Sequence, residues 1–106
     1  MEVFELKYIY PAIFTPTDDV PGYVVEFPDD ESIFTSGEDL LEAVEMAEDV
    51  LPFTLMDYED DGTPIPKASD IRDIKLDDPK SFVTLIKADT DEYRKMLARM
   101  KENGAD

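Results

Sequence analysis

The chain has 106 residues, a formal net charge of −17, and neither cysteine nor histidine. This length allows one compact domain, and the composition excludes disulfides, thiolate metal sites and catalysis by histidine. Residues 8–66 carry sixteen Asp and Glu but no Lys or Arg, so the chain repels nucleic acid and anionic lipid and attracts basic proteins. Because 42% of the residues are hydrophobic and lie between the acids, we expect a folded protein.

Three short strands are predicted in the first third of the chain. Residues 6–14 alternate apolar side chains with period two, and Pro11 favours an edge position because it lacks a backbone donor. Residues 20–27 form the second strand and residues 32–35 the third, each bounded by turns rich in Pro and Asp. Their order predicts an antiparallel meander.

A long helix is predicted next. We expect Ser36 to cap it by accepting a hydrogen bond from the Asp39 amide. Apolar residues at spacings of three and four then form a stripe that faces the sheet: Leu40, Val44, Ala47, Leu51, Leu55 and Tyr58. Pro52 interrupts the stripe and predicts a kink or a restart, and the turn around Gly62 ends the helix.

The pattern in the last third of the chain predicts an irregular connection, a strand and a second helix. The connection spans residues 67–80 and contains a short helical turn near Ile71, and residues 82–87 form the strand. Asp89 or Thr90 caps the terminal helix, whose apolar stripe is Tyr93, Met96, Leu97 and Met100.

These elements give the order βββ-α-β-α. The fold class is therefore α+β, with helices covering one face of a small sheet. We predict a single domain over residues 1–106, with its core in residues 6–87 and a terminal helix at 89–102. No apolar run approaches the ~20 residues that span a bilayer, and the acidic N-terminus is unlike a signal peptide, so we expect a cytoplasmic protein.

Several patterns invite chemical interpretations. Residues 57–62 resemble part of a calcium-binding loop, but Ala68 stands where a bidentate glutamate is needed, which favours a charged helix end. With 27 acids, carboxylate spacings arise by chance, so a metal-dependent hydrolase stays only a minor alternative. We therefore predict no enzymatic activity and no catalytic, metal or cofactor site. The cations of the terminal helix complement its dipole more simply than they bind DNA: Arg94, Lys95, Arg99 and Lys101.

Four segments, in order and with matching gaps, resemble HicB-type antitoxins. They are residues 10–14 (YPAIF), 22–29 (GYVVEFPD), 35–43 (TSGEDLLEA) and 61–66 (DGTPIP). The resemblance implies a partial RNase H-like fold without nuclease activity, in a protein that masks a small basic HicA-type ribonuclease toxin. The charge distribution independently indicates the same kind of partner.

The sequence departs from the family pattern in three places. Residues 30–33 replace a usual glycine-containing turn, Pro52 interrupts the helix, and the chain ends at Asp106 after one short helix. Family members usually continue into a DNA-binding module, so the resemblance does not carry DNA binding over to this chain.

The predicted partner-binding site consists of loop acids beside the second and third strands, with one tyrosine as an aromatic anchor: Asp18, Asp19, Tyr23, Asp29, Asp30 and Glu31. An exposed sheet edge or the apolar stripe of the terminal helix favours a homodimer. The alternative function is a stand-alone HicB-like acidic adaptor, or a self-associating protein with no toxin partner.

Overall fold

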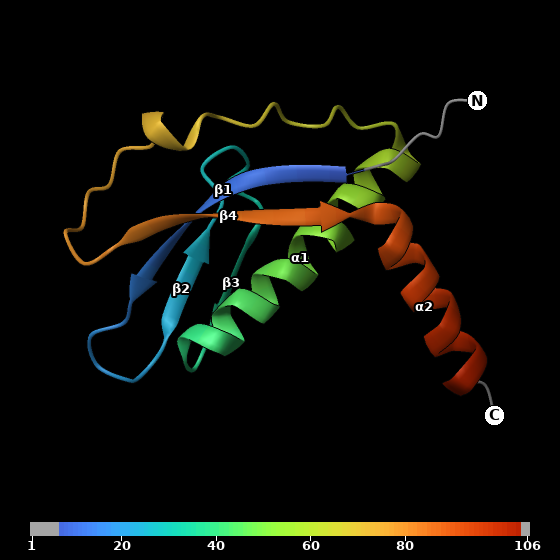
Figure 1. Cartoon of the computed structure of the whole chain (residues 1–106), viewed down its shortest axis with the longest axis horizontal. Coiled ribbons are helices and arrows are strands. Elements are labelled where there is room, and N and C mark those ends of the chain that lie inside the picture. Colours follow the sequence, from blue (N-terminus) through green and yellow to red (C-terminus); the bar gives the residue numbers. More distant parts are fainter. Residues whose placement is uncertain (1–6, 105–106) are drawn as a thin grey trace.

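The computed structural model describes residues 7–104, which form one four-stranded antiparallel sheet and two α-helices (Figure 1). The predicted order βββ-α-β-α is confirmed, as is the α+β class. Leu6, the predicted start of the first strand, lies outside the described residues. In chain order the elements are β1 (Lys7–Pro16), β2 (Tyr23–Glu26), β3 (Phe34–Gly37), α1 (Leu40–Asp61), the 3₁₀ turn η1 (Ile71–Asp73), β4 (Phe82–Asp89) and α2 (Thr90–Gly104).

The strand order in the sheet is β3-β2-β1-β4, so the predicted meander is present and β4 joins its other side. β1 is therefore an interior strand and not the predicted edge strand, although at Pro11 itself only β4 pairs with it. The pairing of β1 with β2 begins only at Ile13, whereas Pro11 lies opposite Leu85 of β4. Pro11 is tolerated because its missing N–H lies outside the β1–β2 ladder.

The second and third strands differ from their predicted limits. Residues 17–22 form a turn closed by the Thr17 amide, which donates to the Gly22 carbonyl at 3.0 Å, so β2 starts later than predicted. A second turn is closed by the Ile33 amide, which donates to the Asp30 carbonyl at 3.0 Å. This turn delays β3 to Phe34, two residues after the predicted start.

α1 begins with a different cap from the predicted one. The Asp39 carboxylate accepts from the Glu42 amide at 2.8 Å, and the Glu42 carboxylate accepts from the Glu38 amide at 2.8 Å. This reciprocal pattern is a capping box. Ser36 cannot serve as the cap because it still belongs to β3, where it pairs with Val24.

α1 also runs unbroken through Pro52, so the predicted restart is wrong. The proline ring is buried, and tertiary packing of this kind routinely overrides helix propensity. The predicted stripe is largely confirmed, since Ala47, Leu51 and Leu55 are buried, but Leu40 is 45% exposed and Ala43 takes the first core position.

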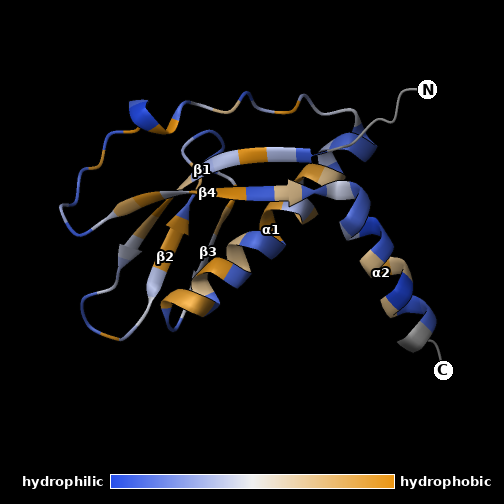
Figure 2. Ribbon diagram, in the orientation of Figure 1, coloured by the Kyte–Doolittle hydropathy of each residue, from blue (hydrophilic) through white to orange (hydrophobic). Residues whose placement is uncertain are grey.

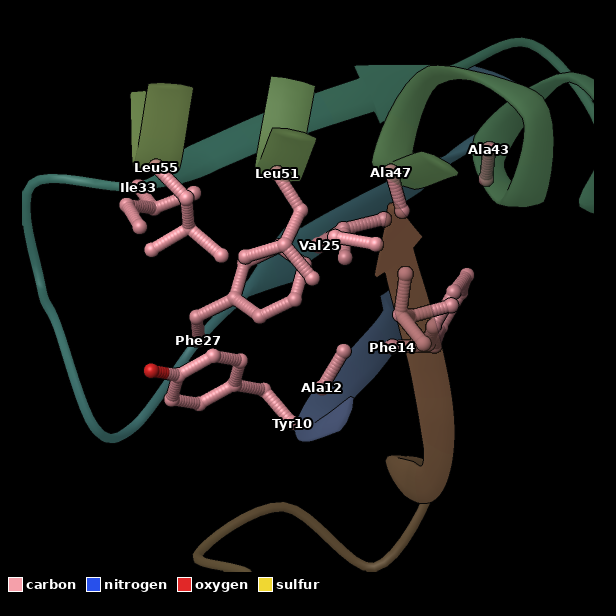
Figure 3. Close-up of a cluster of buried hydrophobic side chains, with 12 residues drawn as sticks. Tyr10, Ala12, Phe14, Val25, Phe27, Ile33, Ala43, Ala47, Leu51 and Leu55 are labelled. Atoms are coloured by element: carbon pink, nitrogen blue, oxygen red, sulfur yellow. The ribbon is translucent and has the colours of Figure 1, made fainter. Parts of the chain in front are cut away.

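The hydrophobic core lies between α1 and one face of the sheet. Leu51 and Leu55 point from the helix toward Phe27 and the strands below it (Figure 3). The buried cluster contains Tyr10, Ala12, Phe14, Val25, Phe27, Ile33, Ala43, Ala47, Leu51, Leu55, Ile86 and Ala88.

α2 does not cover the sheet as predicted. It packs against α1 and projects past the end of the strands (Figure 1), and most of its ribbon has hydrophilic colours (Figure 2). Asp89 caps it by accepting from the Glu92 amide at 3.0 Å, which confirms one of the two predicted caps. Met100, the last residue of the predicted stripe, is 60% exposed. Neither described helix is long and apolar enough to cross a membrane.

The connection between α1 and β4 is irregular, as predicted, and its short helical turn is η1. Asp70 caps this turn by accepting from the Arg72 amide at 2.9 Å. The connection is tied to the rest of the fold where the Tyr10 hydroxyl donates to the Pro66 carbonyl and the Ser69 amide donates to Asp29 at 2.9 Å. These bonds bring the connection beside the turn between β2 and β3.

Gly37 marks the closest approach of the sheet to α1. A Cβ at this position would lie 2.3 Å from the backbone nitrogen of Ala43 and 2.6 Å from its Cα, and backbone atoms cannot move aside easily.

We expect Gly37→Ala to lower the free energy of unfolding by about 3 kcal/mol, measured by urea denaturation. The control is Gly62→Ala, because a Cβ at Gly62 has no other atom within 4 Å. Only the positive φ of 74° disfavours alanine there, and this should lower the free energy of unfolding by about 1 kcal/mol. Equal losses in the two variants would contradict the proposed clash.

Candidate functional site

The structure separates the six predicted partner-binding residues. Asp18 and Asp19 lie in the loop before β2, whereas Asp29, Asp30 and Glu31 lie in the turn after it. The two groups therefore lie at opposite ends of a four-residue strand, which spans roughly 13 Å. They do not form one continuous patch.

In the first loop the two acids are exposed and the tyrosine is not free. Asp18 pairs with Lys80 at 3.1 Å, but both side chains are largely exposed, so the pair stabilises the fold little. Tyr23 is half-buried and packs edge-on against Phe82, with ring centroids 6.3 Å apart, on the face that α1 covers. This packing positions β2 and leaves only part of the Tyr23 ring accessible to a partner.

In the second loop, two of the three acids are engaged within the fold. Asp29 accepts from both the amide and the hydroxyl of Ser69. Asp30 accepts from the Ser32 amide at 3.0 Å and from the Tyr58 hydroxyl at 2.6 Å. Burial alone would raise the pKa of Asp30, but these hydrogen bonds outweigh burial and leave that pKa below its ordinary value.

Glu31 differs from its two neighbours. Its side chain is exposed, and no hydrogen bond or ion pair joins it to another residue within the range 7–104. Glu31 is thus the acid of this turn that is available to a partner.

The outward surface of α1 adds a second set of acids. Its 22 residues contain eight Asp and Glu and no Lys or Arg. Most of them face solvent: Glu42, Glu45, Glu48, Asp49, Asp57, Asp60 and Asp61. Helical geometry gathers them on one side of the molecule, which the sequence analysis did not single out as a surface although the absence of basic residues was visible.

The face of the sheet opposite α1 is apolar and largely exposed. Strand side chains alternate between two faces, and α1 covers only one of them. On the other face Phe34 is 64% exposed, and four further large apolar residues are also exposed or half-buried: Ile9, Ile13, Val24 and Leu85. An exposed apolar patch of this kind indicates a protein-binding surface.

A hollow of about 450 Å³ lies on this open face, and we call it the Phe34 hollow. It is lined by Ile13, Val24, Glu26, Phe27, Pro28, Glu31 and Phe34. The lining includes the carboxylates of Glu26 and Glu31 but no Lys or Arg. Only Glu31 among these residues was in the predicted site. The alternation along β2 and β3 was the signal that would have found Val24, Glu26 and Phe34.

The acidic segment that resembled a calcium loop is the last turn of α1. The helix continues to Asp61, and Gly62 ends it with a φ of 74° while its amide donates to the Tyr58 carbonyl. The helical backbone of residues 57–61 is thus incompatible with a calcium loop starting there. Across residues 7–104 no three acids are grouped so as to hold a metal ion.

A partly buried carboxylate ties α2 to α1 and β1. Glu59, whose side chain is 13% exposed, accepts from the Tyr8 hydroxyl at 2.5 Å, the Thr90 hydroxyl at 2.9 Å and the Arg94 guanidinium at 2.7 Å. Arg94 also contacts Asp60 at 2.5 Å. Burial, followed by the bond to Glu59, raises the pKa of Tyr8 to about 12.

Comparisons with known proteins give one matching family and two similar solved structures. The family model described as "HicB_like antitoxin of bacterial toxin-antitoxin system" matches residues 10–101. A chain of a solved toxin-antitoxin complex from Streptococcus pneumoniae is 26% identical, with a TM-score of 0.74 over 94% of this chain and 90% of that one. A chain of a HicA3 and HicB3 toxin-antitoxin complex is 24% identical, with a TM-score of 0.61 over 77% of this chain and 99% of that one. No curated protein matches.

The Glu59 contacts predict a specific pH dependence. Burial alone would raise the pKa of Glu59, but the bonds from Tyr8, Arg94 and Thr90 lower it below its ordinary value. A lowered folded-state pKa gives stability that is present above the unfolded-state pKa and is lost as the pH falls through the folded-state value.

We therefore expect Glu59→Gln to lower the free energy of unfolding at pH 7 by about 2 kcal/mol. Below about pH 4.5, its stability should fall less steeply than that of the unaltered chain. Urea titrations between pH 7 and pH 3 measure both effects. Asp57→Asn, which alters an exposed acid of the same helix, serves as the control. Parallel pH profiles for the unaltered chain and Glu59→Gln would contradict the assignment.

Proposed function

Because the chain belongs to the HicB-like antitoxin family, we propose that it binds and neutralises a small basic ribonuclease toxin of the HicA type. The antitoxin family points to a regulator that works without catalysis. The chain in the toxin-antitoxin complex from Streptococcus pneumoniae matches nearly the whole of this one and supports a toxin as the partner.

The observation that supports the proposal most is the excess negative charge of residues 8–66, which the fold displays on α1 and on the loops around β2 and of which only a few acids pair with Lys80 or Arg94. A ribonuclease must hold phosphates, and it does so largely with Lys and Arg. An acidic surface attracts those groups over a distance and competes with RNA for them. Neutralisation then follows from occupation of the RNA-binding surface and needs no chemical step.

The six predicted residues take different parts in this proposal. Asp18, Asp19 and Glu31 are exposed and serve as points of first contact with the toxin. Asp29 and Asp30 hold the turn after β2 in place through Ser69, Ser32 and Tyr58, and Tyr23 orients β2.

Assembly and location complete the proposal. A homodimer forms through the apolar side of α2, which the exposure of Met100 supports, and the protein acts in the cytoplasm.

Neutralisation is tested directly with a purified HicA-type toxin, taken from the gene beside that of this chain if that gene encodes a small basic protein. We expect equimolar amounts of the two to form a stable complex and to stop cleavage of a labelled RNA. A serum albumin of similar acidity is the control for non-specific charge effects. Full RNA cleavage at a tenfold excess of this chain would defeat the proposal and would favour the stand-alone acidic adaptor.

The loop acids are tested through the association rate. Asp19→Lys and Glu31→Lys each should slow association with the toxin by about tenfold at low salt and flatten its salt dependence, because they weaken electrostatic steering. Glu102→Lys makes the same change in net charge on α2 and is the matched control. Stopped-flow measurements at several salt concentrations give the rates. If all three variants slow association equally, net charge alone acts and these loops are not the site.

A further inference from the structure

We propose that the Phe34 hollow receives an arginine side chain of the toxin. This inference rests on the proposed function and assigns the central contact to the open face of the sheet, where Glu31 takes part both in the approach and in the hollow, whereas Asp18 and Asp19 act in the approach alone. It depends on the apolar floor of the hollow, on two unpaired carboxylates at its rim and on its position at the edge of the sheet.

The floor of the hollow is apolar and accessible. Ile13 of β1, Val24 of β2 and Phe34 of β3 all point away from α1, and Phe34 is 64% exposed. The volume of about 450 Å³ exceeds what one side chain needs. It therefore leaves room for a neighbouring apolar side chain of the partner as well.

The rim of the hollow carries unbalanced negative charge. Glu26 and Glu31 line it, and neither makes a hydrogen bond or an ion pair with any residue of the described range 7–104. Asp29 and Asp30, in the same turn, do have partners within the fold. The acids that line the hollow are thus the ones left for an external cation.

This combination fits arginine better than other side chains. The methylene stem of arginine covers apolar surface while its charged group reaches the rim. Its planar guanidinium also stacks on an aromatic ring such as that of Phe34 and bonds carboxylates with two donors. Lysine offers the charge without the planar group, and an anionic or purely apolar side chain leaves Glu26 and Glu31 unpaired.

The position of the hollow suits a chain segment of the partner. β3 is the edge strand of the sheet, with β2 on its inner side only. An extended segment that lies along this edge places alternate side chains over the open face. Arginine then enters the hollow while the backbone of the segment follows β3.

The inference is tested by measuring toxin affinity by calorimetry with neutral variants of the rim. We expect the double variant E26Q/E31Q, and separately F34A, to weaken binding at least tenfold, because hot-spot contacts lie in such central pockets. The matched control is D73N/D77N, which removes the same number of charges from exposed positions of the connection between α1 and β4, a segment outside the proposed binding surface. It should change the affinity less than threefold. Equal losses in the two double variants would overturn the inference while leaving the antitoxin role intact.

A second measurement does not depend on the toxin. The ¹⁵N-labelled chain is titrated with a capped tripeptide that has arginine between two leucines, and with a counterpart that has glutamate in place of arginine. We expect amide shifts at Val24, Glu26 and Phe34 with the arginine peptide only. Such shifts without any toxin binding would keep the hollow as a cation site and refute the proposed function. If the shifts are absent, or equal with both peptides, the Phe34 hollow is not an arginine-binding site.

Discussion

The packing of α1 on one face of the sheet is the constraint on which the rest of the structure depends. Ala43 and Ala47 bring the helix close to the strands, and Gly37 has no room for a side chain beneath the first turn. This contact decides which strand residues are buried. Because a single helix covers a single face, it also leaves the alternate residues, Val24 and Phe34 among them, on an open apolar surface.

The same helix organises the charge of the molecule. Its inward side is apolar, and its outward side displays seven exposed acids without a basic residue of the same helix, beside exposed apolar residues such as Leu41 and Phe53. Near its C-terminal end, Glu59 uses one carboxylate to hold Tyr8, Thr90 and Arg94 together. The acids of this protein therefore divide into those that stabilise the fold and those that face solvent, and the proposed binding of a basic toxin depends on the second group.

Much of the fold was predictable because the local patterns were strong. Period-two alternation located β1, and spacings of three and four located α1, although tertiary packing kept α1 intact through Pro52. Ser36 was the wrong prediction for the cap. Asp39 forms a full capping box with Glu42, and Ser36 belongs to β3. In the candidate site, Asp29 and Asp30 were chosen for their charge, yet their hydrogen bonds to Ser69 and Tyr58 depend on segments far away in the sequence.

The sequence by itself determined the sign and location of the charge, the order of the elements and the membership of the HicB-like antitoxin family, because composition and local periodicity are properties of the chain. Only the tertiary structure decided which acids are available. Glu26 and Glu31 have no partner within the described residues and line an apolar hollow. The neighbouring Asp29 and Asp30 accept hydrogen bonds from other parts of the fold. Side-chain partners depend on contacts between distant segments, and no local pattern encodes those contacts.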